Sequence, residues 1–192
     1  FLPMRPCQPE LVGNGFMLVG DAGYQVSTNS GFGVPGSVIA GKIAAEVAAS
    51  AIRKGDVSRK ALWEYNVRYK RGFGSSRPFA DAIRIFVQNL SHEDLDRLVG
   101  SGLIGSKEFS ALWMDRTFRY SIPELMGKLR AGKSYPGLLT RTSLVYLIAC
   151  LLERHYKNFP SSIDDFNSWM LKRTLLYAFL FKVLRLKRGI SS

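Results

Sequence analysis

The sequence predicts a mostly helical fold to which one short strand contributes near the start. Residues 15–20 form an apolar run with the length and the bracketing glycines of a strand. From residue 36 onward, apolar residues recur at helical spacing, and glycine, proline or capping residues separate the runs. Neither an internal repeat nor a low-complexity stretch interrupts this pattern. The chain therefore resembles a helical protein with one unpaired strand.

The first elements are expected in the order strand, loop and helix. Residues 1–14 are broken by prolines and are expected to be extended, and the strand at 15–20 follows. A loop of glycine, serine, asparagine and threonine occupies residues 24–34. The first helix is predicted from about Gly36 to Lys54, where Gly55-Asp56 stops it.

Capping residues indicate where several later helices begin. Ser58 is the expected N-cap of the second helix, and Ser91 that of a helix that follows the amphipathic stretch 79–90. Ser162 and Asp165 have a spacing like that of a capping box and are expected to open the last helix, which runs to Arg188. Further helices are expected at 106–114, 122–131 and 138–158.

The single predicted strand suggests how the chain is divided into domains. An isolated strand leaves its own backbone N–H and C=O groups without partners. We therefore expect it to complete the sheet of an α/β domain whose other strands lie outside this chain. On this basis residues 1–56 form the C-terminal end of that α/β domain, and residues 57–192 form a helical C-terminal domain.

Charge and cysteine content limit the possible partners. The net charge is +12, with 27 basic and 15 acidic residues, which suggests nucleic acid or an anionic membrane surface. The basic residues form no recognisable RNA- or DNA-binding motif, so nucleic acid is not expected. The two cysteines, Cys7 and Cys150, lie far apart, which argues against a disulfide framework and for a reducing, cytoplasmic location.

The C-terminal helix allows two interpretations. Its apolar run LLYAFLF, like the run LVYLIACLL before it, is far shorter than the roughly 20 residues that a membrane span requires. A broad apolar face flanked by basic residues such as Lys172, Arg173, Lys182 and Arg185 suits peripheral contact with an anionic bilayer. The same pattern suits a core-packing helix with a basic outer face. The aromatic residues are similarly open between a lipid tunnel and the core: Trp63, Trp113, Tyr120, Tyr135 and Trp169.

The stretch from residue 15 to residue 36 points to a binding site. Asp21 follows the strand at its C-terminal end, where open α/β sheets bind ligands. Gly31 and Gly33 expose backbone amides and allow a flat ligand to approach. The helix from Gly36 directs its positive end toward the same space. These features suit a polyol chain and an electron-accepting ring, although a glycine-rich strand–turn–helix without a ligand would look the same.

The same residues resemble a known family. The stretch GDAGYQVSTNSGFGVPGSVIAGKIAAE, followed by KGDVSRKALWEYN, resembles the second FAD motif of flavoproteins of the glutathione-reductase type in the hydroxybenzoate-hydroxylase superfamily. More narrowly it resembles the geranylgeranyl reductase family, which saturates isoprenoid chains of archaeal membrane lipids. The stretch LVGNGFMLVGDA, which leads into the motif, also resembles the corresponding stretch of that family. The resemblance is closest over residues 3–72.

The resemblance implies a role for each residue of the motif. Asp21 would hold the ribityl hydroxyls of FAD, while Gly20 and Ala22 would shape the turn beside it. The helix that follows would stabilise negative charge on the reduced ring. The amides that would face the pyrimidine edge of the flavin belong to Gly31, Phe32 and Gly33. We assign no catalytic residue, because the flavin would carry out the chemistry. We assign no metal ligand, because the two cysteines and two histidines have no spacing that resembles a zinc site.

Several residues depart from the family pattern. Gly23 stands where a second alanine is usual, Ser27-Thr28 stands where Asn-Pro is common, and Phe32 interrupts the usual glycine triplet. The sequence contains no GxGxxG loop after a first strand to hold the pyrophosphate. We therefore expect the C-terminal portion of a FAD-dependent reductase, inactive alone, whose partners are the N-terminal half of the same polypeptide and a prenyl-lipid substrate.

Two alternatives remain. A quinone-linked electron-transfer dehydrogenase or a flavin monooxygenase of the same superfamily would share the Gly-Asp motif. A non-catalytic, basic helical module that binds anionic membranes would explain Phe32 and the missing pyrophosphate loop.

Overall fold

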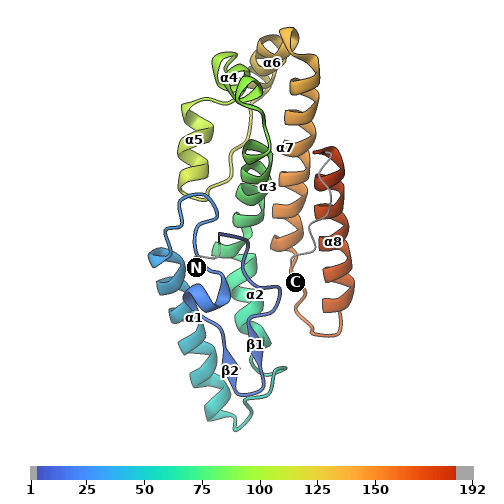
Figure 1. The fold of residues 1–192 in the computed structure, drawn as a ribbon. Helices are drawn as coiled ribbons and strands as arrows, with labels where there is room; N and C mark the ends of the chain where they lie inside the picture. The colour runs from blue at the N-terminus through green and yellow to red at the C-terminus, as the bar shows by residue number, and fades with distance from the viewer. Residues whose placement is uncertain (1–3, 185–192) are drawn as a thin grey trace.

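Helices dominate the chain, as the sequence predicts. The computed structural model describes residues 4–184, and Figure 1 shows an elongated arrangement in which α7 stands between α3 and α8. The shorter helices α4, α5 and α6 gather at one end, and α1, α2 and a small hairpin gather at the other (Figure 1). The helices are α1 (Val34–Arg53), α2 (Trp63–Arg71), α3 (Arg77–Gln88), α4 (His92–Gly100), α5 (Ser106–Trp113), α6 (Ile122–Ala131), α7 (Pro136–Lys157) and α8 (Phe166–Val183). Short 3-10 turns occupy Gly20–Gly23, Phe73–Ser75 and Gly132–Ser134.

The predicted strand at 15–20 is wrong in its length and in its pairing. Strand β2 covers only Phe16–Met17, and it pairs antiparallel with β1 (Val12–Gly13) in a two-stranded hairpin. Gly15 closes the turn with φ 77°, a conformation that glycine adopts without a steric cost. The prediction missed this pairing because the strands are too short to show an alternating apolar pattern.

Helix α1 begins two residues earlier than the sequence suggested. It starts at Val34, with Pro35 in its first turn, where the missing proline N–H costs no hydrogen bond. Gly55 ends it with φ 67°, as the Gly-Asp signal predicted.

The predicted caps have three outcomes. The Ser91 side chain accepts a hydrogen bond from the Asp94 N–H, which confirms it as the N-cap of α4. The Ser58 Oγ accepts from the Ala61 N–H, 3.2 Å away, but this caps a turn, and α2 itself begins at Trp63. The prediction for Ser162 is wrong, because its hydroxyl pairs with Asp164 in a turn before α8. Residues 185–188 of the predicted last helix lie outside the described residues.

Two clusters of buried apolar side chains form the core. One joins α3, α4, α5, α7 and α8 through residues such as Phe79, Leu98, Ile148 and Leu180. The other joins the N-terminal segment, α1 and α2 to the junction of α7 and α8. In this second cluster Trp63 stacks on Phe159, with ring centroids 5.5 Å apart. Helix α7 contributes to both clusters and therefore ties the two ends of the molecule together.

Helix α7 has the length and mean hydropathy of a membrane span over Pro136–Lys157, where a window of 18 residues averages 1.2. One face of it is nevertheless buried against α3 and α8, including Val145, Ile148 and Leu152. A third of that window is buried, and Leu147 and Leu151 on α7 are about half exposed.

The aromatic residues divide between core and surface. Trp63 and Trp169 are buried, while 67% of Trp113 is exposed. Tyr120 and Tyr135 are half-buried and pack against the first cluster. Trp63 and Trp169 therefore belong to the core, one of the two interpretations that the sequence left open. Cys7 and Cys150 are both free thiols.

Candidate cofactor site

The Gly-Asp turn is held by its own backbone. Val19 is extended, with φ −129° and ψ 147°, and the 3-10 turn Gly20–Gly23 follows directly. Gly20 has φ 68°, and Tyr24 closes the turn in the left-handed region with φ 54°. The Tyr24 N–H donates to the carbonyl oxygen of Asp21, 3.0 Å away, and the Gln25 N–H donates to that of Gly20 at the same distance. The turn leaves the Asp21 side chain exposed at its outer edge.

The glycine-rich loop folds back on itself. The Ser27 N–H donates to the Phe32 carbonyl oxygen, 3.1 Å away, and the Gly31 N–H donates to the Ser27 carbonyl oxygen, 3.2 Å away. The Ser27 hydroxyl also accepts from the Ser30 N–H at 3.0 Å. Gly31 has φ 71°, which favours glycine at this position. These contacts bring the end of the loop back toward the Gly-Asp turn.

Turn and loop meet around an open hollow at the start of α1, with a volume of about 360 Å³. The residues that line it are Asp21, Gly31, Gly33, Val34, Ser37 and Val38. A Cβ atom at Gly33 would lie 3.3 Å from Asp21 Oδ1, and one at Gly20 would lie 3.2 Å from Ser37 Oγ. Glycine at both positions therefore lets the loop, the turn and the helix approach one another.

The predicted site residues fall into two groups. Asp21, Gly31 and Gly33 line the hollow together. Gly20 and Ala22 belong to the adjoining turn but do not line the hollow. The Phe32 side chain is 62% exposed and lies outside the lining as well. The phenyl ring therefore leaves the hollow open, although it interrupts the glycine triplet.

The donors and acceptors of the hollow fit a flavin with its ribityl chain. Within the described chain the Asp21 carboxylate forms no hydrogen bond or ion pair, so both of its oxygens can accept from hydroxyl groups. The amides of Gly33 and Val34 donate no hydrogen bond to residues 4–184, as expected at a helix N-terminus. The helix dipole adds partial positive charge at the same point. The Asp21 carboxylate, which can accept from a polyol, thus lies beside backbone amides that can donate to an electron-rich ring edge.

Gln25 and Tyr65 hold the Gly-Asp turn from behind. The Gly20 N–H donates to Gln25 Oε1, 2.7 Å away, and Gln25 Nε2 donates to the Tyr65 hydroxyl on α2, 2.9 Å away. Tyr65 donates in turn to the Leu18 carbonyl oxygen, at 2.8 Å. Burial raises the pKa of Tyr65 to about 12, so the hydroxyl remains a donor at neutral pH.

Arg77 on α3 holds the glycine-rich loop. Its Nη1 donates to the Val26 carbonyl oxygen, 2.6 Å away, and its Nε lies 3.9 Å from Asp115 Oδ2. Asp115 also accepts a long hydrogen bond of 3.4 Å from the Thr28 hydroxyl. Burial raises the pKa of Asp115, and the Arg77 charge opposes that rise. Arg77 and Asp115 thus each connect the loop to the helical part of the chain through a hydrogen bond.

Gly36 lets α1 lie against this anchor. A Cβ atom there would lie only 2.2 Å from the Gln25 carbonyl oxygen and 2.5 Å from Arg77 Nη2. Gly36, predicted to begin the helix, instead packs closely within the first turn of α1.

Sequence reasoning missed these supporting residues. Gln25, Tyr65, Arg77 and Asp115 lie up to 90 positions apart and match no motif. The one available signal was a set of polar residues inside otherwise apolar stretches, such as Asp115 after SALWM.

Comparisons with known proteins show what the chain is similar to. No family model matches it. It is 26% identical over 168 residues to the digeranylgeranylglycerophospholipid reductase of Sulfolobus acidocaldarius, which is 88% of this chain and 37% of that protein. It is 32% identical over 122 residues to the protein of that name from Methanothrix thermoacetophila, which is 62% of this chain and 31% of that protein. Over 87 residues it is 41% identical to digeranylgeranylglycerophospholipid reductase 1 of Methanococcoides burtonii, or 45% of this chain and 21% of that protein.

The matches cover only part of each relative's length. The chain spans about a third of the length of the Sulfolobus relative and less of the other two. The matched relatives share one name apart from a number, and two of them match more than half of this chain. The similarity therefore supports a single family across most of the chain.

Proposed function

We propose that this chain belongs to the geranylgeranyl reductase family and forms part of a FAD-dependent enzyme that saturates C=C bonds in the isoprenoid chains of membrane lipids. The observation that carries the proposal is the similarity to curated digeranylgeranylglycerophospholipid reductases over as much as 88% of this chain. The hollow formed by Asp21, Gly31 and Gly33 supports it independently, because its donors and acceptors suit a flavin.

In this proposal each part of the hollow has a role. When bound and reduced, FAD supplies the hydride for the C=C bond. Asp21 would accept hydrogen bonds from the ribityl hydroxyls, and the free amides of Gly33 and Val34 would donate to the ring edge. The predicted amides of Gly31 and Phe32 would not, because they donate to Ser27 and Ser30 within the loop. The positive end of α1 favours negative charge on the reduced ring. Gln25 and Arg77 keep turn and loop at the spacing that the ligand needs.

Visible absorption spectra of the full-length polypeptide test the cofactor. Flavin bands should appear in the purified protein and should be lost in Asp21→Ala. The matched control is Asp96→Ala, which removes an exposed carboxylate on α4, outside the hollow, and should keep the bands. A full-length protein without flavin, or an Asp21→Ala variant with normal flavin content, would contradict the proposal.

Product analysis separates the members of the superfamily. With a reductant and a geranylgeranyl lipid, mass spectrometry should show a gain of hydrogen at the C=C bonds. Quinone reduction without any change in the lipid would support an electron-transfer dehydrogenase instead. Incorporation of oxygen would support a monooxygenase.

The exposed face of α8 suits peripheral contact with a membrane. Leu171, Leu175 and Phe179 recur at intervals of four residues and are each about half exposed or more. Lys172 and Lys182 lie on the same helix and would face anionic headgroups. Sedimentation with anionic and with neutral vesicles tests this, and Leu175→Ser should weaken binding to the anionic vesicles. A flavin-free protein that still sediments with them would favour the non-catalytic membrane module.

A further inference from the structure

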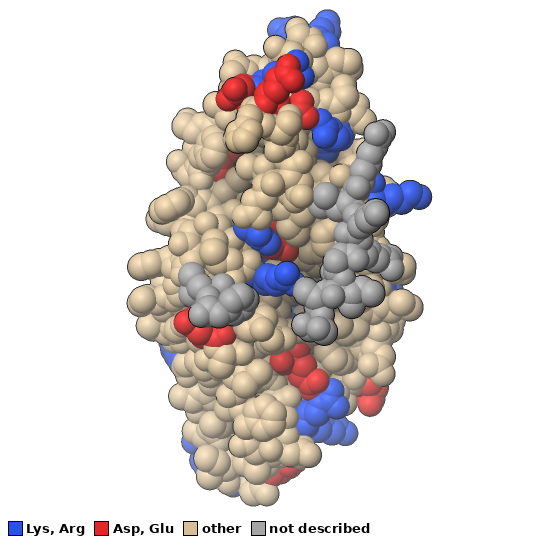
Figure 2. Space-filling view, in the orientation of Figure 1, with Lys and Arg blue, Asp and Glu red and all other residues tan. Residues whose placement is uncertain are grey.

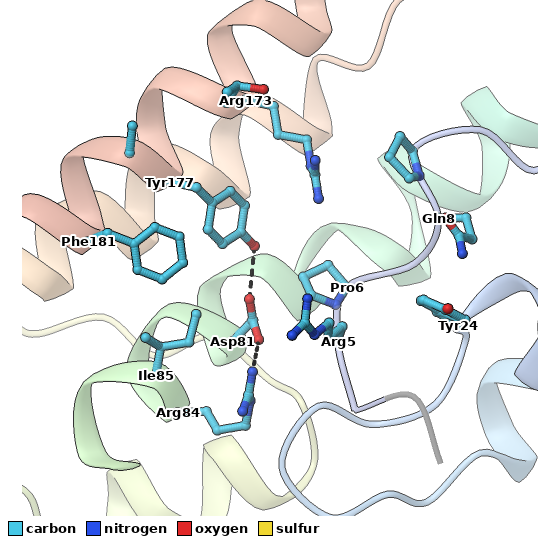
Figure 3. Close-up of a pocket in the computed structure, with 13 residues that line it drawn as sticks. Arg5, Pro6, Gln8, Tyr24, Asp81, Arg84, Ile85, Arg173, Tyr177 and Phe181 are labelled. Atoms are coloured by element: carbon cyan, nitrogen blue, oxygen red, sulfur yellow. Dashed lines mark hydrogen bonds and ion pairs between the residues drawn. The ribbon is translucent and has the colours of Figure 1, made fainter. Parts of the chain in front are cut away.

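A second, larger cavity of about 620 Å³ lies between the N-terminal segment, α3 and α8. Figure 3 shows Arg173, Tyr177 and Phe181 projecting from α8 on one side, with Asp81, Arg84 and Ile85 on α3 opposite them. Arg5, Pro6 and Gln8 of the N-terminal segment close a third side (Figure 3). None of the residues that line the hollow at Asp21 belongs to this lining.

The lining carries an excess of positive charge. Among the described residues it contains the three arginines Arg5, Arg84 and Arg173 and one acidic residue, Asp81. That carboxylate is already engaged, since it lies 2.6 Å from Arg84 Nη2 and accepts a hydrogen bond of 3.1 Å from the Tyr177 hydroxyl. Figure 2 shows basic and acidic side chains side by side near the middle of this face. Arg173, by contrast, has no carboxylate partner among the described residues of the lining.

Arg173 and Arg84 keep unused donors. Arg173 Nε donates to the Tyr156 hydroxyl, 2.8 Å away, and within residues 4–184 the Arg173 guanidinium forms no ion pair with a carboxylate. Arg84 Nε is buried and finds no acceptor in the described part of the chain. A planar guanidinium binds the oxygens of a phosphate through paired hydrogen bonds. An anion in this cavity would satisfy donors that are otherwise left unmet.

Part of the cavity lining is apolar. Ile85, Ala178 and Phe181 lie beside the charged groups in the lining. The cavity therefore offers a cationic part and an apolar part to one ligand, as an amphiphile requires. It also adjoins the candidate cofactor site, because Tyr24 lines the cavity and directly follows the turn that carries Asp21.

We propose that this cavity binds a phosphate group through Arg173 and Arg84, with the attached chain starting along Ile85 and Phe181. The assignment of that phosphate to the lipid substrate rests on the proposed function. Phosphate binding itself does not, and it can be measured without flavin or turnover.

Titration calorimetry of the full-length polypeptide with inorganic phosphate tests the site. Arg173→Gln should weaken phosphate binding about tenfold, the effect of losing one charge-assisted pair. The matched control, Lys172→Gln, removes the same charge from the neighbouring, exposed position and should change the affinity less than twofold. Arg84→Gln should also weaken phosphate binding, as a second and independent test. Equal affinity in all of these variants, or no phosphate binding by the wild type, would overturn the site.

If Arg173→Gln has a lower melting temperature than the wild type, its weaker binding could come from a loss of stability. Arg173→Lys then replaces it as the test variant. It keeps the charge and loses the planar fork, so it should fall between wild type and Arg173→Gln. A lysine variant that binds phosphate as weakly as the glutamine variant, with the same loss of melting temperature, would mean that Arg173 acts on the fold alone.

Kinetics with a prenyl monophosphate and the matching prenyl alcohol separate a lipid phosphate from free phosphate. In Arg173→Gln the KM for the phosphate ester should rise about tenfold while its kcat, the KM for the alcohol and the flavin content stay unchanged. An equal KM rise for both substrates, or none, would overturn the lipid assignment. A wild-type protein without flavin would instead count against the proposed function. The calorimetric test of phosphate binding would still be valid in that case.

Discussion

Arg77 on α3 donates a hydrogen bond of 2.6 Å to the carbonyl oxygen of Val26 in the glycine-rich loop. The two residues lie 51 positions apart, and only 2% of Arg77 is exposed. The helical part of the chain therefore sets the position of a loop that the sequence reads as part of the preceding domain. The candidate cofactor site and the helices that follow form one connected structure.

Replacing Arg77 with methionine should loosen this connection. Arg77→Met leaves the Val26 carbonyl without its donor and the buried Asp115 without its cation. We expect the free energy of unfolding to fall by about 3 kcal/mol, together with a loss of bound flavin. Urea denaturation measures the change against Arg53→Met, which removes an exposed arginine from the end of α1. A change no larger than that of the control would show that the anchor contributes little.

Two neighbouring tyrosines on α2 should respond differently to the loss of their hydroxyls. Tyr65→Phe removes the partner of both Leu18 and Gln25, and it should destabilise the protein by about 2 kcal/mol. The Tyr69 hydroxyl is buried and has no hydrogen-bond partner among the described residues. Tyr69→Phe should therefore be neutral or slightly stabilising. Thermal melts of the two variants compare them directly, and equal losses would count against the role of Tyr65.

Two glycines of α1 provide a test of close packing. Gly36→Ala would place a methyl group 2.2 Å from the Gln25 carbonyl oxygen, and the shift this forces should cost about 3 kcal/mol. Gly41 has no atom within 4 Å of the added Cβ, so Gly41→Ala should stabilise α1 by up to about 1 kcal/mol. Opposite signs in chemical denaturation are the expected result. A stable Gly36→Ala protein would mean that the contact between loop and helix is looser than described.

The buried Lys70 should make stability depend on pH. Burial lowers the pKa of Lys70 from its usual 10.5 to about 8. Between these values the unfolded chain binds more protons than the folded one, so stability should rise with pH across this window. The rise attributable to this side chain is about 3 kcal/mol and should be absent in Lys70→Met.

Unfolding in urea at pH 7.5 and at pH 10.5 checks this prediction about Lys70. Lys60→Met, which removes an exposed lysine just before α2, serves as the control and should keep the wild-type difference between the two pH values. A Lys70→Met protein with the same pH dependence as the wild type would assign the effect to other groups.

The local patterns of the sequence predicted most of the elements but not how they pair. Ser91 caps α4 as expected, because a cap depends on residues three positions apart. The strand at 15–20 and the Ser162 cap were wrong, because in each case a competing turn close in sequence takes the same groups. The division at residue 56 stays a prediction, while one core cluster includes side chains from both sides of it.

The sequence alone determined the helical character, the Gly-Asp turn, the glycine-rich loop and the resemblance to a reductase family. These features depend on residue type and short spacing, which can be read along the chain. Only the tertiary structure placed Arg77 against Val26, Tyr65 against Gln25, and the arginines of α3 and α8 around one cavity. Those contacts join residues tens of positions apart, and the packing of helices, not a local preference, brings them together.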